Sequence, residues 1–383
     1  MFEPSTIELS RVALSNNLQM VRQLLNDNTV LSSVIKGNAY GHGIREMVGL
    51  LQAEGVDHFS VFNAEEAYDV HPFLRSEDCL MIMGDVESDA LAWAIEHDVH
   101  FFVFDLKRLN EAMRLAEHIG KAANLHLEVE TGMNRTGFPP DDFKEAVELI
   151  KANKSLASFS GLCTHFAGAE SISNYHRVQS QIRKYRRAVD YCSKVDATPS
   201  FKHTCCSAGV LRYPRMTMDL VRVGILQYGH WPSTETLVEY MTKNKCEENP
   251  LKRVLSWKSR LMSTKDVKTG QFVGYGSSYL AMSDIRIGIV PIGYAYGYSR
   301  ILSNQGHVLI HGKRAPVIGT INMNALTVDI TDVPEAKKGD EVILIGRSGS
   351  EAITVSSFGE LSRQLNYELL TRLPSNIPRH VVN

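Results

Sequence analysis

The chain has 383 residues, of which 44% are hydrophobic and 22% charged, and its formal net charge is -2. This is globular composition with material for two domains or for one large barrel with an appendage. The charge gives no reason to expect nucleic acid or an anionic membrane as partner, and neither a membrane-spanning run nor an export signal is visible. We therefore expect a cytoplasmic protein acting on a small molecule, with its six scattered cysteines reduced.

Short apolar runs alternate with amphipathic stretches up to about residue 230. The runs end near eight positions, Lys36, Asn63, Gly84, Asp105, Glu130, Phe166, Ser207 and Ile225. Helical periodicity marks several intervals between them, at 44–54, 89–96, 106–119 and 142–152. This alternation predicts an α/β fold, a (β/α)8 TIM-like barrel. A doubly wound open sheet is the alternative, but the glycines after the first run do not match its dinucleotide-binding turn.

The pattern of residue types changes after about Thr234. Residues 235–250 are polar and helical or loop-like, and β-branched runs then follow at 254–263, 285–291, 308–311, 317–321, 326–330 and 341–345, with a short helix at 358–365. We predict a barrel over residues 10–234 and a mostly β C-terminal domain over 235–383, with residues 1–9 packing against the second domain.

Lys36 is the residue that most needs an explanation. The apolar run Val30–Ile35 leads directly into it, and Gly37 follows, so the lysine sits where a buried strand meets a loop. Partial desolvation favours the neutral amine, which can form a Schiff base with an aldehyde cofactor or a carbonyl substrate. A lysine that merely extends into solvent from a strand end is the ordinary alternative.

Other polar residues follow later strands of the predicted barrel. The carboxyl ends of barrel strands converge on one face, so residues there are candidates for one site. They are Arg135 after the fifth run, His165 at the end of the sixth, Ser207 at the end of the seventh and Arg222 in the eighth. With Lys36 they offer an amine, an imidazole and donors for carboxylate or phosphate groups.

Six motifs together resemble the alanine racemase family of pyridoxal-phosphate enzymes over nearly the whole chain. They are Val-Ile-Lys-Gly-Asn-Ala-Tyr-Gly-His-Gly at 34–43, the loop 131–137, Thr-His-Phe at 164–166, Arg-Val-Gly-Ile at 222–225, Val-Gly-Tyr-Gly at 273–276 and Ile-Gly-Tyr-Ala-x-Gly-Tyr at 292–298. The resemblance implies that the barrel binds pyridoxal 5'-phosphate through Lys36 and that the substrate is an amino acid. It also implies a head-to-tail homodimer in which Tyr275 of one chain completes the site of the other.

The resemblance further implies the interconversion of L- and D-alanine, which supplies D-alanine for biosynthesis, with Lys36 and Tyr275 as two bases on opposite faces. A tyrosine with a usual pKa of about 10 needs a neighbour that favours its phenolate, and the resemblance assigns this to the group around His165. Arg222 would face the pyridine nitrogen and keep it unprotonated. A turn aromatic and an ordinary buried ion pair are the alternatives for Tyr275 and Arg222.

The same resemblance assigns the remaining contacts. The cofactor phosphate would be bound by Ser207, Tyr40 and Tyr367 and by the backbone at Gly224 and Ile225. The substrate carboxylate would be bound by Arg135, with Met323 and Tyr294 completing the substrate site. A surface salt bridge is the alternative for Arg135.

The chain also departs from the family pattern. Glu128 stands where many relatives carry a carbamylated lysine that supports the substrate-binding arginine, so we expect Glu128 to supply the negative charge without a carbamate. Four further positions, Cys206, Tyr296, Thr320 and Asn324, carry residues other than the common asparagine, aspartate, arginine and aspartate. These changes leave open a broader tolerance for the substrate side chain, or drift without consequence.

Three other functions remain open on the residues alone. A racemase of another amino acid, or of a broad range, would use the same groups. A pyridoxal-phosphate decarboxylase on a related barrel would reuse Lys36, but Arg135 and Tyr275 argue against it. A cofactor carrier would not need residues 273–383. We expect no metal site, because His42, His165 and His203 lack ligand-spaced partners.

Overall fold

The computed structural model describes residues 3–362 and 366–383, which form two compact units. The barrel unit comprises Ala13–Ala39 and Met47–Lys252, and the C-terminal unit comprises the described residues up to Val12, Tyr40–Glu46 and the described part of Arg253–Asn383. Residues 235–252 thus group by contacts with the barrel unit. The domain boundary near residue 235 stays a prediction.

The barrel unit contains eight parallel strands. They are β2(Val30–Val34), β3(His58–Val61), β4(Cys79–Ile82), β5(His100–Val103), β6(Ala123–Glu128), β7(Ala157–Cys163), β8(Phe201–His203) and β9(Leu220–Val223), in the order β8-β7-β6-β5-β4-β3-β2-β9. The two ends of this order meet, because Cys206 and Arg222 form a parallel bridge and the Arg222 amide donates to the Cys205 carbonyl at 2.9 Å. The predicted barrel is confirmed, and every predicted run contains or directly follows an observed strand.

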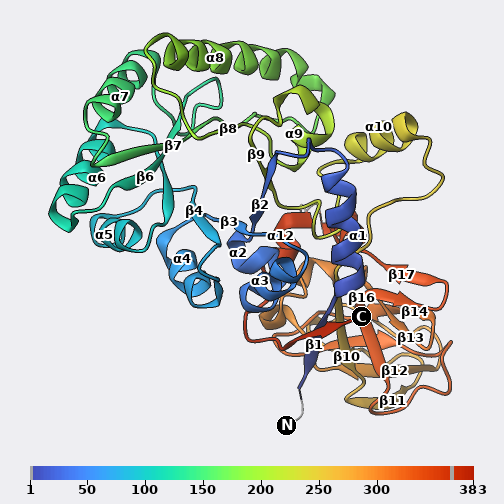
Figure 1. The fold of residues 1–383 in the computed structure, drawn as a ribbon. Coiled ribbons are helices and arrows are strands. Elements are labelled where there is room, and N and C mark those ends of the chain that lie inside the picture. The colour runs from blue at the N-terminus through green and yellow to red at the C-terminus, as the bar shows by residue number, and fades with distance from the viewer. Residues whose placement is uncertain (1–2, 363–365) are drawn as a thin grey trace. The chain divides into compact units, whose positions relative to one another are not determined.

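Helices lie outside the strands of the barrel (Figure 1). Those of the barrel unit are α4(Ala64–Val70), α5(Ser88–Glu96), α6(Leu106–Ile119), α7(Pro140–Ala152), α8(Tyr175–Lys194), α9(Ser207–Arg212) and α10(Thr234–Asn244), while α1(Arg11–Arg22) and α3(Ile44–Ala53) extend over residues of both units. Polar caps define some of their starts, since the Asn63 side chain accepts from the Glu66 amide at 2.9 Å and Asp105 accepts from the Arg108 amide at 2.8 Å.

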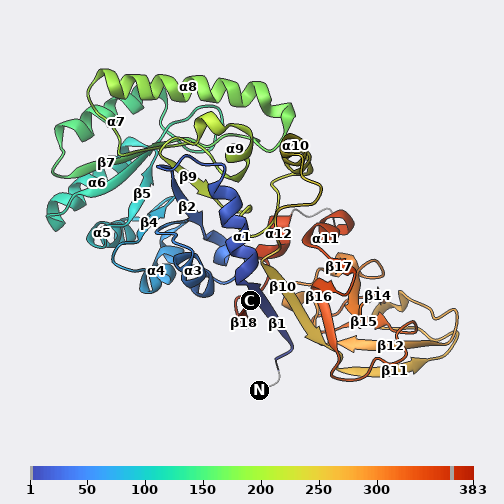
Figure 2. The ribbon, with the colours of Figure 1, turned by 45° about the vertical axis from the view of Figure 1, so that its right-hand side comes forward.

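The C-terminal unit is mostly β, as predicted. Its strands are β1(Ser5–Ser10), β10(Leu255–Arg260), β11(Ser263–Val267), β12(Ile285–Val290), β13(His307–Ile310), β14(Lys313–Ile318), β15(Leu326–Asp329), β16(Glu341–Ser348), β17(Glu351–Ile353) and β18(Arg379–Val382). They form one sheet in the order β11-β12-β15-β14-β13-β16-β10-β1-β18, with β17 paired to β16. Figure 2 shows several of these strands, among them β10, β12 and β16. β1 pairs antiparallel with β10 and parallel with β18. Helices α11(Val355–Ser362) and α12(Asn366–Thr371) follow; the predicted helix at 358–365 overlaps α11, and its residues 363–365 lie outside the described part.

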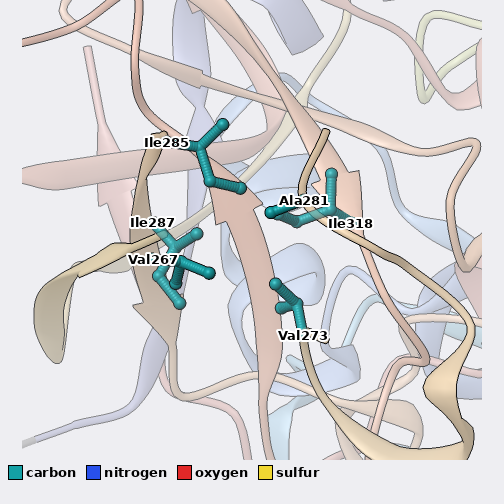
Figure 3. Packing of buried hydrophobic residues seen from close by; sticks show 6 residues of the cluster. All are labelled: Val267, Val273, Ala281, Ile285, Ile287 and Ile318. Atoms are coloured by element: carbon teal, nitrogen blue, oxygen red, sulfur yellow. The ribbon is translucent and has the colours of Figure 1, made fainter. Parts of the chain in front are cut away.

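A small apolar cluster lies at one end of this sheet. It joins Val267, Ile285, Ile287 and Ile318 from three strands to Val273 and Ala281 from the connection between β11 and β12 (Figure 3). That connection also closes on itself, since the Val273 amide donates to the Tyr279 carbonyl at 2.9 Å. The cluster therefore anchors the loop that carries Tyr275.

Candidate active site

Lys36 lies two residues beyond the end of β2, with its side chain partly buried. Its Nζ atom is 5.7 Å from the centre of the Phe62 ring. Burial lowers the pKa of the Lys36 amine below its usual value, and the positive charges of Arg135 and Arg222 act in the same direction, against the opposing charge of Glu66. This setting increases the neutral fraction of the amine, the form that attacks a carbonyl carbon.

The backbone after Lys36 makes a left-handed turn. The φ angles of Gly37, Asn38, Ala39 and Tyr40 are 62°, 53°, 52° and 53°. For each non-glycine residue this conformation costs roughly 1–2 kcal/mol, so other contacts must hold it. The Ala39 amide donates to the Ile35 carbonyl at 2.7 Å, which closes the turn from inside.

Glu66, on α4, also holds this turn. Its Oε1 accepts from the Gly37 amide at 2.5 Å and its Oε2 accepts from the Phe62 amide at 2.7 Å. Glu66 was not among the predicted site residues. The available signal was Asn63 three residues before it, which is the spacing of a helix start and gives no indication of Lys36.

Arg222 points into the barrel and is only 5% exposed. Its Nη2 donates to the Thr164 carbonyl at 2.9 Å, and its Nη1 donates to the His203 carbonyl at 3.2 Å and to the His203 Nδ1. These acceptors are all neutral. The guanidinium is therefore held by hydrogen bonds that leave its positive charge uncompensated by a bonded carboxylate.

His165 follows β7 in the same unit. Burial lowers the pKa of its imidazole to about 3, and the positive charges of Arg222, Arg135 and Lys36 contribute to the shift. His165 is thus neutral at pH 7. His165 can therefore stabilise a nearby anion only by hydrogen bonding, and the positive charge in this region comes from Arg135 and Arg222.

Ser207 begins α9, and its hydroxyl bonds to the turn that follows β9. Its Oγ accepts from the Gly224 amide at 3.1 Å and from the Leu226 amide at 3.5 Å. The predicted phosphate-binding residues Ser207, Gly224 and Ile225 therefore lie together at the ends of two strands. A hydroxyl beside clustered backbone N–H groups is a donor set suited to a phosphate.

The loop 131–137 carries Arg135, whose side chain is exposed. Glu130 shapes the loop, because its carboxylate accepts from the amides of Gly132 and of Asn134, the second at 2.8 Å. Glu128, at the end of β6, is 5% exposed. Burial raises the pKa of the Glu128 carboxyl, while a hydrogen bond from Thr136 and the charge of Arg135 oppose that change.

The other predicted residues belong to the C-terminal unit. Tyr40 and Tyr367 form an aromatic pair, with ring centres 5.9 Å apart and planes at 50°. Gly41 beside them has a φ of 77°, and a Cβ there would lie 1.9 Å from the Leu370 carbonyl oxygen. Only glycine permits this close approach.

Tyr294 and Met323 are neighbours in two adjoining loops of that unit. The amides of Tyr294 and Ala295 donate to the carbonyls of Asn322 and Met323 at 3.1 and 3.0 Å. Gly293 allows the loops to approach, since a Cβ there would lie 2.0 Å from the Asn322 carbonyl oxygen. Tyr275 projects from its own loop with 73% of its surface exposed.

Each unit thus assembles part of the predicted set. The barrel unit brings Lys36, Arg135, His165 and Arg222 within mutual electrostatic range and joins Ser207 to Gly224. The C-terminal unit pairs Tyr40 with Tyr367 and Tyr294 with Met323. Residues 3–362 and 366–383 contain no group of three or more His, Cys, Asp or Glu side chains arranged to hold a metal ion, and no helix among them is long and apolar enough to cross a bilayer.

Comparison with known proteins matches both parts of the chain to one family. The family model for the alanine racemase N-terminal domain matches residues 9–232, and that for the alanine racemase C-terminal domain matches residues 254–381. The chain belongs to the alanine racemase family. Among related members, the alanine racemase of Leptospira interrogans is 34% identical over 99% of this chain and 96% of its own length.

Two further members of the alanine racemase family support the assignment over the full length. The alanine racemase of Halothermothrix orenii is 31% identical over 99% of this chain and 97% of its own length. The crystal structure of alanine racemase from Streptomyces lavendulae superimposes with a TM-score of 0.90 at 27% identity, covering 100% of this chain and 98% of that one. The expected family and fold are therefore confirmed.

Proposed function

We propose that this member of the alanine racemase family is a pyridoxal-phosphate-dependent enzyme that interconverts L- and D-alanine. The observation that carries the proposal is the Lys36 amine, which lies just beyond the end of β2. Burial and the positive charges of Arg135 and Arg222 lower its pKa. A neutral amine on a rigid support can bind an aldehyde covalently and can later accept a proton.

The residues present fit pyridoxal 5'-phosphate. Lys36 would bind it covalently, Ser207 with the backbone of Gly224 and Ile225 would hold its phosphate, and Tyr40 and Tyr367 would add phenol donors. Arg222 would face the ring nitrogen and keep it unprotonated, since a guanidinium does not give up its proton. When bound, the cofactor accepts electron density from the substrate carbon that loses its proton.

Two groups would remove the proton of the substrate α-carbon and return it. The Nζ of Lys36 would take or return it on one face, and the Oη of Tyr275 on the other. Arg135 would orient the substrate through its carboxylate, because a guanidinium fork matches two oxygens. Met323 and Tyr294, which adjoin each other, would complete the substrate site.

A homodimer with shared sites accounts for the exposure of Tyr275. The loop that carries it also exposes Phe272 at 58% and Met282 at 81%, while the apolar cluster beneath anchors its backbone. Large exposed apolar side chains on an anchored loop are typical of a surface that another chain covers. We propose that this loop meets a second copy and supplies Tyr275 to that copy's Lys36.

The activity is tested with purified protein and pyridoxal phosphate, incubated with L-alanine in deuterated water. We expect optical rotation to decay to zero as the α-proton signal disappears. A panel of other L-amino acids tests whether Cys206, Tyr296, Thr320 and Asn324 accompany a broader specificity. Release of carbon dioxide would instead support the decarboxylase, and absence of exchange with every amino acid would contradict the proposal.

Shared sites are tested by complementation between two inactive variants, Lys36→Ala and Tyr275→Phe. A mixed dimer would hold one complete site and one that lacks both bases, so activity should return when the two chains are co-expressed. A mixture of the same proteins that cannot exchange subunits serves as control. Activity that does not return in isolated mixed dimers would place both bases in one chain.

Glu128 is proposed to support Arg135 directly, in place of a carbamylated lysine. We expect Glu128→Gln to raise KM for alanine about fivefold with a smaller change in kcat, since one charge-assisted interaction is lost. Glu128→Lys restores the common family residue, and its activity should become dependent on bicarbonate, whereas that of the parent enzyme should not. A bicarbonate response in the parent enzyme would refute this role.

A further inference from the structure

Three histidines connect Arg222 to the opposite end of the barrel. Arg222 Nη1 bonds to Nδ1 of His203, the last residue of β8. His203 Nε2 lies 2.8 Å from His126 Nδ1, and His126 Nε2 lies 2.9 Å from Nδ1 of His100, the first residue of β5. We call Arg222, His203, His126 and His100 the histidine line. It runs from the carboxyl end of one strand to the amino end of another.

The backbone makes room for the middle member. A Cβ at position 161 of β7 would lie 2.0 Å from His126 Nδ1, so Gly161 is required where the imidazole crosses that strand. The β6–β7 register shifts at this point, pairing Leu125 with Phe159 and His126 with Gly161. The shift skips Ser160 and places the glycine under the ring. Such a shift is a built feature that re-aims side chains.

An aromatic ring packs along the line. Phe102 stacks on His126 at 18° with centres 6.2 Å apart, and its ring centre lies 5.8 Å from Arg222 Cζ. His126 and His203 have no exposed surface. The imidazoles are therefore fixed in orientation by packing, and they must satisfy their polar atoms through one another.

Arg222 dictates where the protons of this line lie. A guanidinium can only donate, so His203 Nδ1 must accept and its proton must sit on Nε2. The same argument then places the protons of His126 and His100 on their Nε2 atoms. Burial, with neighbouring positive charge, lowers the pKa of His203 and His126 well below the usual value, and burial lowers that of His100 to about 4, so all three are neutral at pH 7.

We propose that His126 and His100 are positioning residues that hold the Arg222 guanidinium in one orientation through His203. The inference rests on the proposed function, in which Arg222 faces the ring nitrogen of the cofactor. The line supplies a neutral acceptor of fixed direction. It therefore orients the arginine without cancelling its charge, which a carboxylate partner would do.

The first test is imidazole 15N NMR of the purified protein at pH 7.5, with assignments from single histidine variants. Three neutral imidazoles protonated at Nε2 are expected for positions 100, 126 and 203. Protonation at Nδ1, or a cationic imidazole, at position 126 or 203 would overturn the proposal. This readout requires no turnover, so it separates failure of the line from failure of the proposed racemase activity.

The second test compares His126→Leu with His126→Gln in the cofactor-loaded enzyme. The amide of glutamine can accept from His203 and donate to His100, whereas leucine breaks the line. We expect leucine to lower kcat about tenfold with less change in KM and to alter the pH dependence of the cofactor absorption, and glutamine to restore most of both. Equal effects of leucine and glutamine would indicate a space-filling role.

Variants at His100 and His58 test whether the effects of His126→Leu arise from general unfolding. His100 is only partly buried, so His100→Phe and His100→Gln should fold and repeat the contrast on a smaller scale. His58 is a buried barrel imidazole that bonds to Ser32 Oγ at 2.9 Å and has no hydrogen bond in the line, although its ring meets that of His100 edge-on with centres 6.5 Å apart. His58→Leu should leave the cofactor spectrum unchanged. A spectral change in His58→Leu as large as that in His126→Leu would refute the proposal.

Discussion

The interior of the barrel and the apolar cluster of the C-terminal unit differ in the kind of side chain that they bury. Ser32, His58, His126, Glu128 and Arg222 are all at least 95% buried inside the barrel, each with polar interactions, whereas the cluster beside β11 and β12 is made of valine, isoleucine and alanine. The barrel places charge where water is scarce. The C-terminal unit exposes Tyr275, the proposed second base, and uses apolar packing to anchor the loop that carries it.

This difference determines how each region should respond to substitution. Removal of a hydrogen-bonded polar group inside the barrel leaves its partner unsatisfied, and that costs more than the hydrogen bond itself contributes. Apolar packing in the C-terminal unit fails in smaller steps, because neighbouring side chains relax. Chemistry and stability are therefore coupled in the barrel and largely separate in the C-terminal unit.

The largest effect is expected from Lys36→Ala. Loss of the amine should lower kcat by on the order of 10³-fold or more, since no other group can form the covalent bond. Borohydride treatment followed by mass spectrometry should show the cofactor attached to the parent chain and absent from the variant. Urea unfolding should change little, because removing the amine also removes its desolvation cost. Covalent cofactor retained by the variant would contradict the role of Lys36.

Acid should weaken the barrel unit more than the C-terminal unit. The pKa values of His58 and His165 are about 3 and that of His100 is about 4, against 6.5 in the unfolded chain. The unfolded state therefore binds more protons below pH 6.5, and stability falls as pH drops towards these values. Each of these three imidazoles should contribute about 1 kcal/mol per pH unit.

Tryptophan fluorescence can separate the two units in this experiment. Trp257 lies in the C-terminal unit, while Trp93 and Trp231 lie in the barrel unit. Urea unfolding at pH 7 and pH 5 with single-tryptophan variants should show the larger loss for the barrel reporters. The variant His58→Leu should reduce that loss. Equal losses in both units would remove the proposed contrast.

A smaller effect is expected from Glu66→Gln. The Glu66 carboxylate now accepts hydrogen bonds from the backbone amides of Gly37 and Phe62. In the glutamine variant, the side-chain NH2 group would face one of these two amides, donor against donor. We expect a loss of about 1–3 kcal/mol of stability and lower activity, because the left-handed turn after Lys36 loosens. Glu65→Gln, in the same first turn of α4 but exposed, is the control and should leave both unchanged.

The smallest effect is expected from Ile287→Val in the apolar cluster. Loss of one buried methylene should cost about 0.5–1.5 kcal/mol. Activity should stay unchanged, since Val273 still anchors the loop that carries Tyr275. Chemical unfolding and steady-state kinetics measure the two quantities. A marked fall in activity would mean that packing in this unit is tuned to catalysis.

The sequence predicted the parts of the molecule that depend on local pattern. The apolar runs ending near Lys36 and Asn63 are the strands β2 and β3, because buried parallel strands are continuous apolar segments bounded by turn residues. The prediction of Lys36, Ser207 and Arg222 as site residues rests on a related pattern, since the carboxyl ends of barrel strands converge on one face.

Features that depend on pairing between distant segments were not predictable. The register shift opposite His126 and the approach of Glu66 to Gly37 arise only when neighbouring strands are in place. The sequence gives His203 no metal-ligand partners and no other role, because spacing along the chain does not reveal that it bonds to Arg222. The pairing of β1 with β10 is likewise a long-range event that no local pattern encodes.

The position of β1 has a consequence for synthesis. This strand is synthesised long before its partners β10 and β18, because both lie far along the chain from it. Until they emerge, its backbone donors and acceptors are unpaired. Pairing over such separations is slow and leaves strand edges open to other chains. We therefore expect β1 to stay unpaired during synthesis until β10 has been made, so that its edges are open to association with other chains.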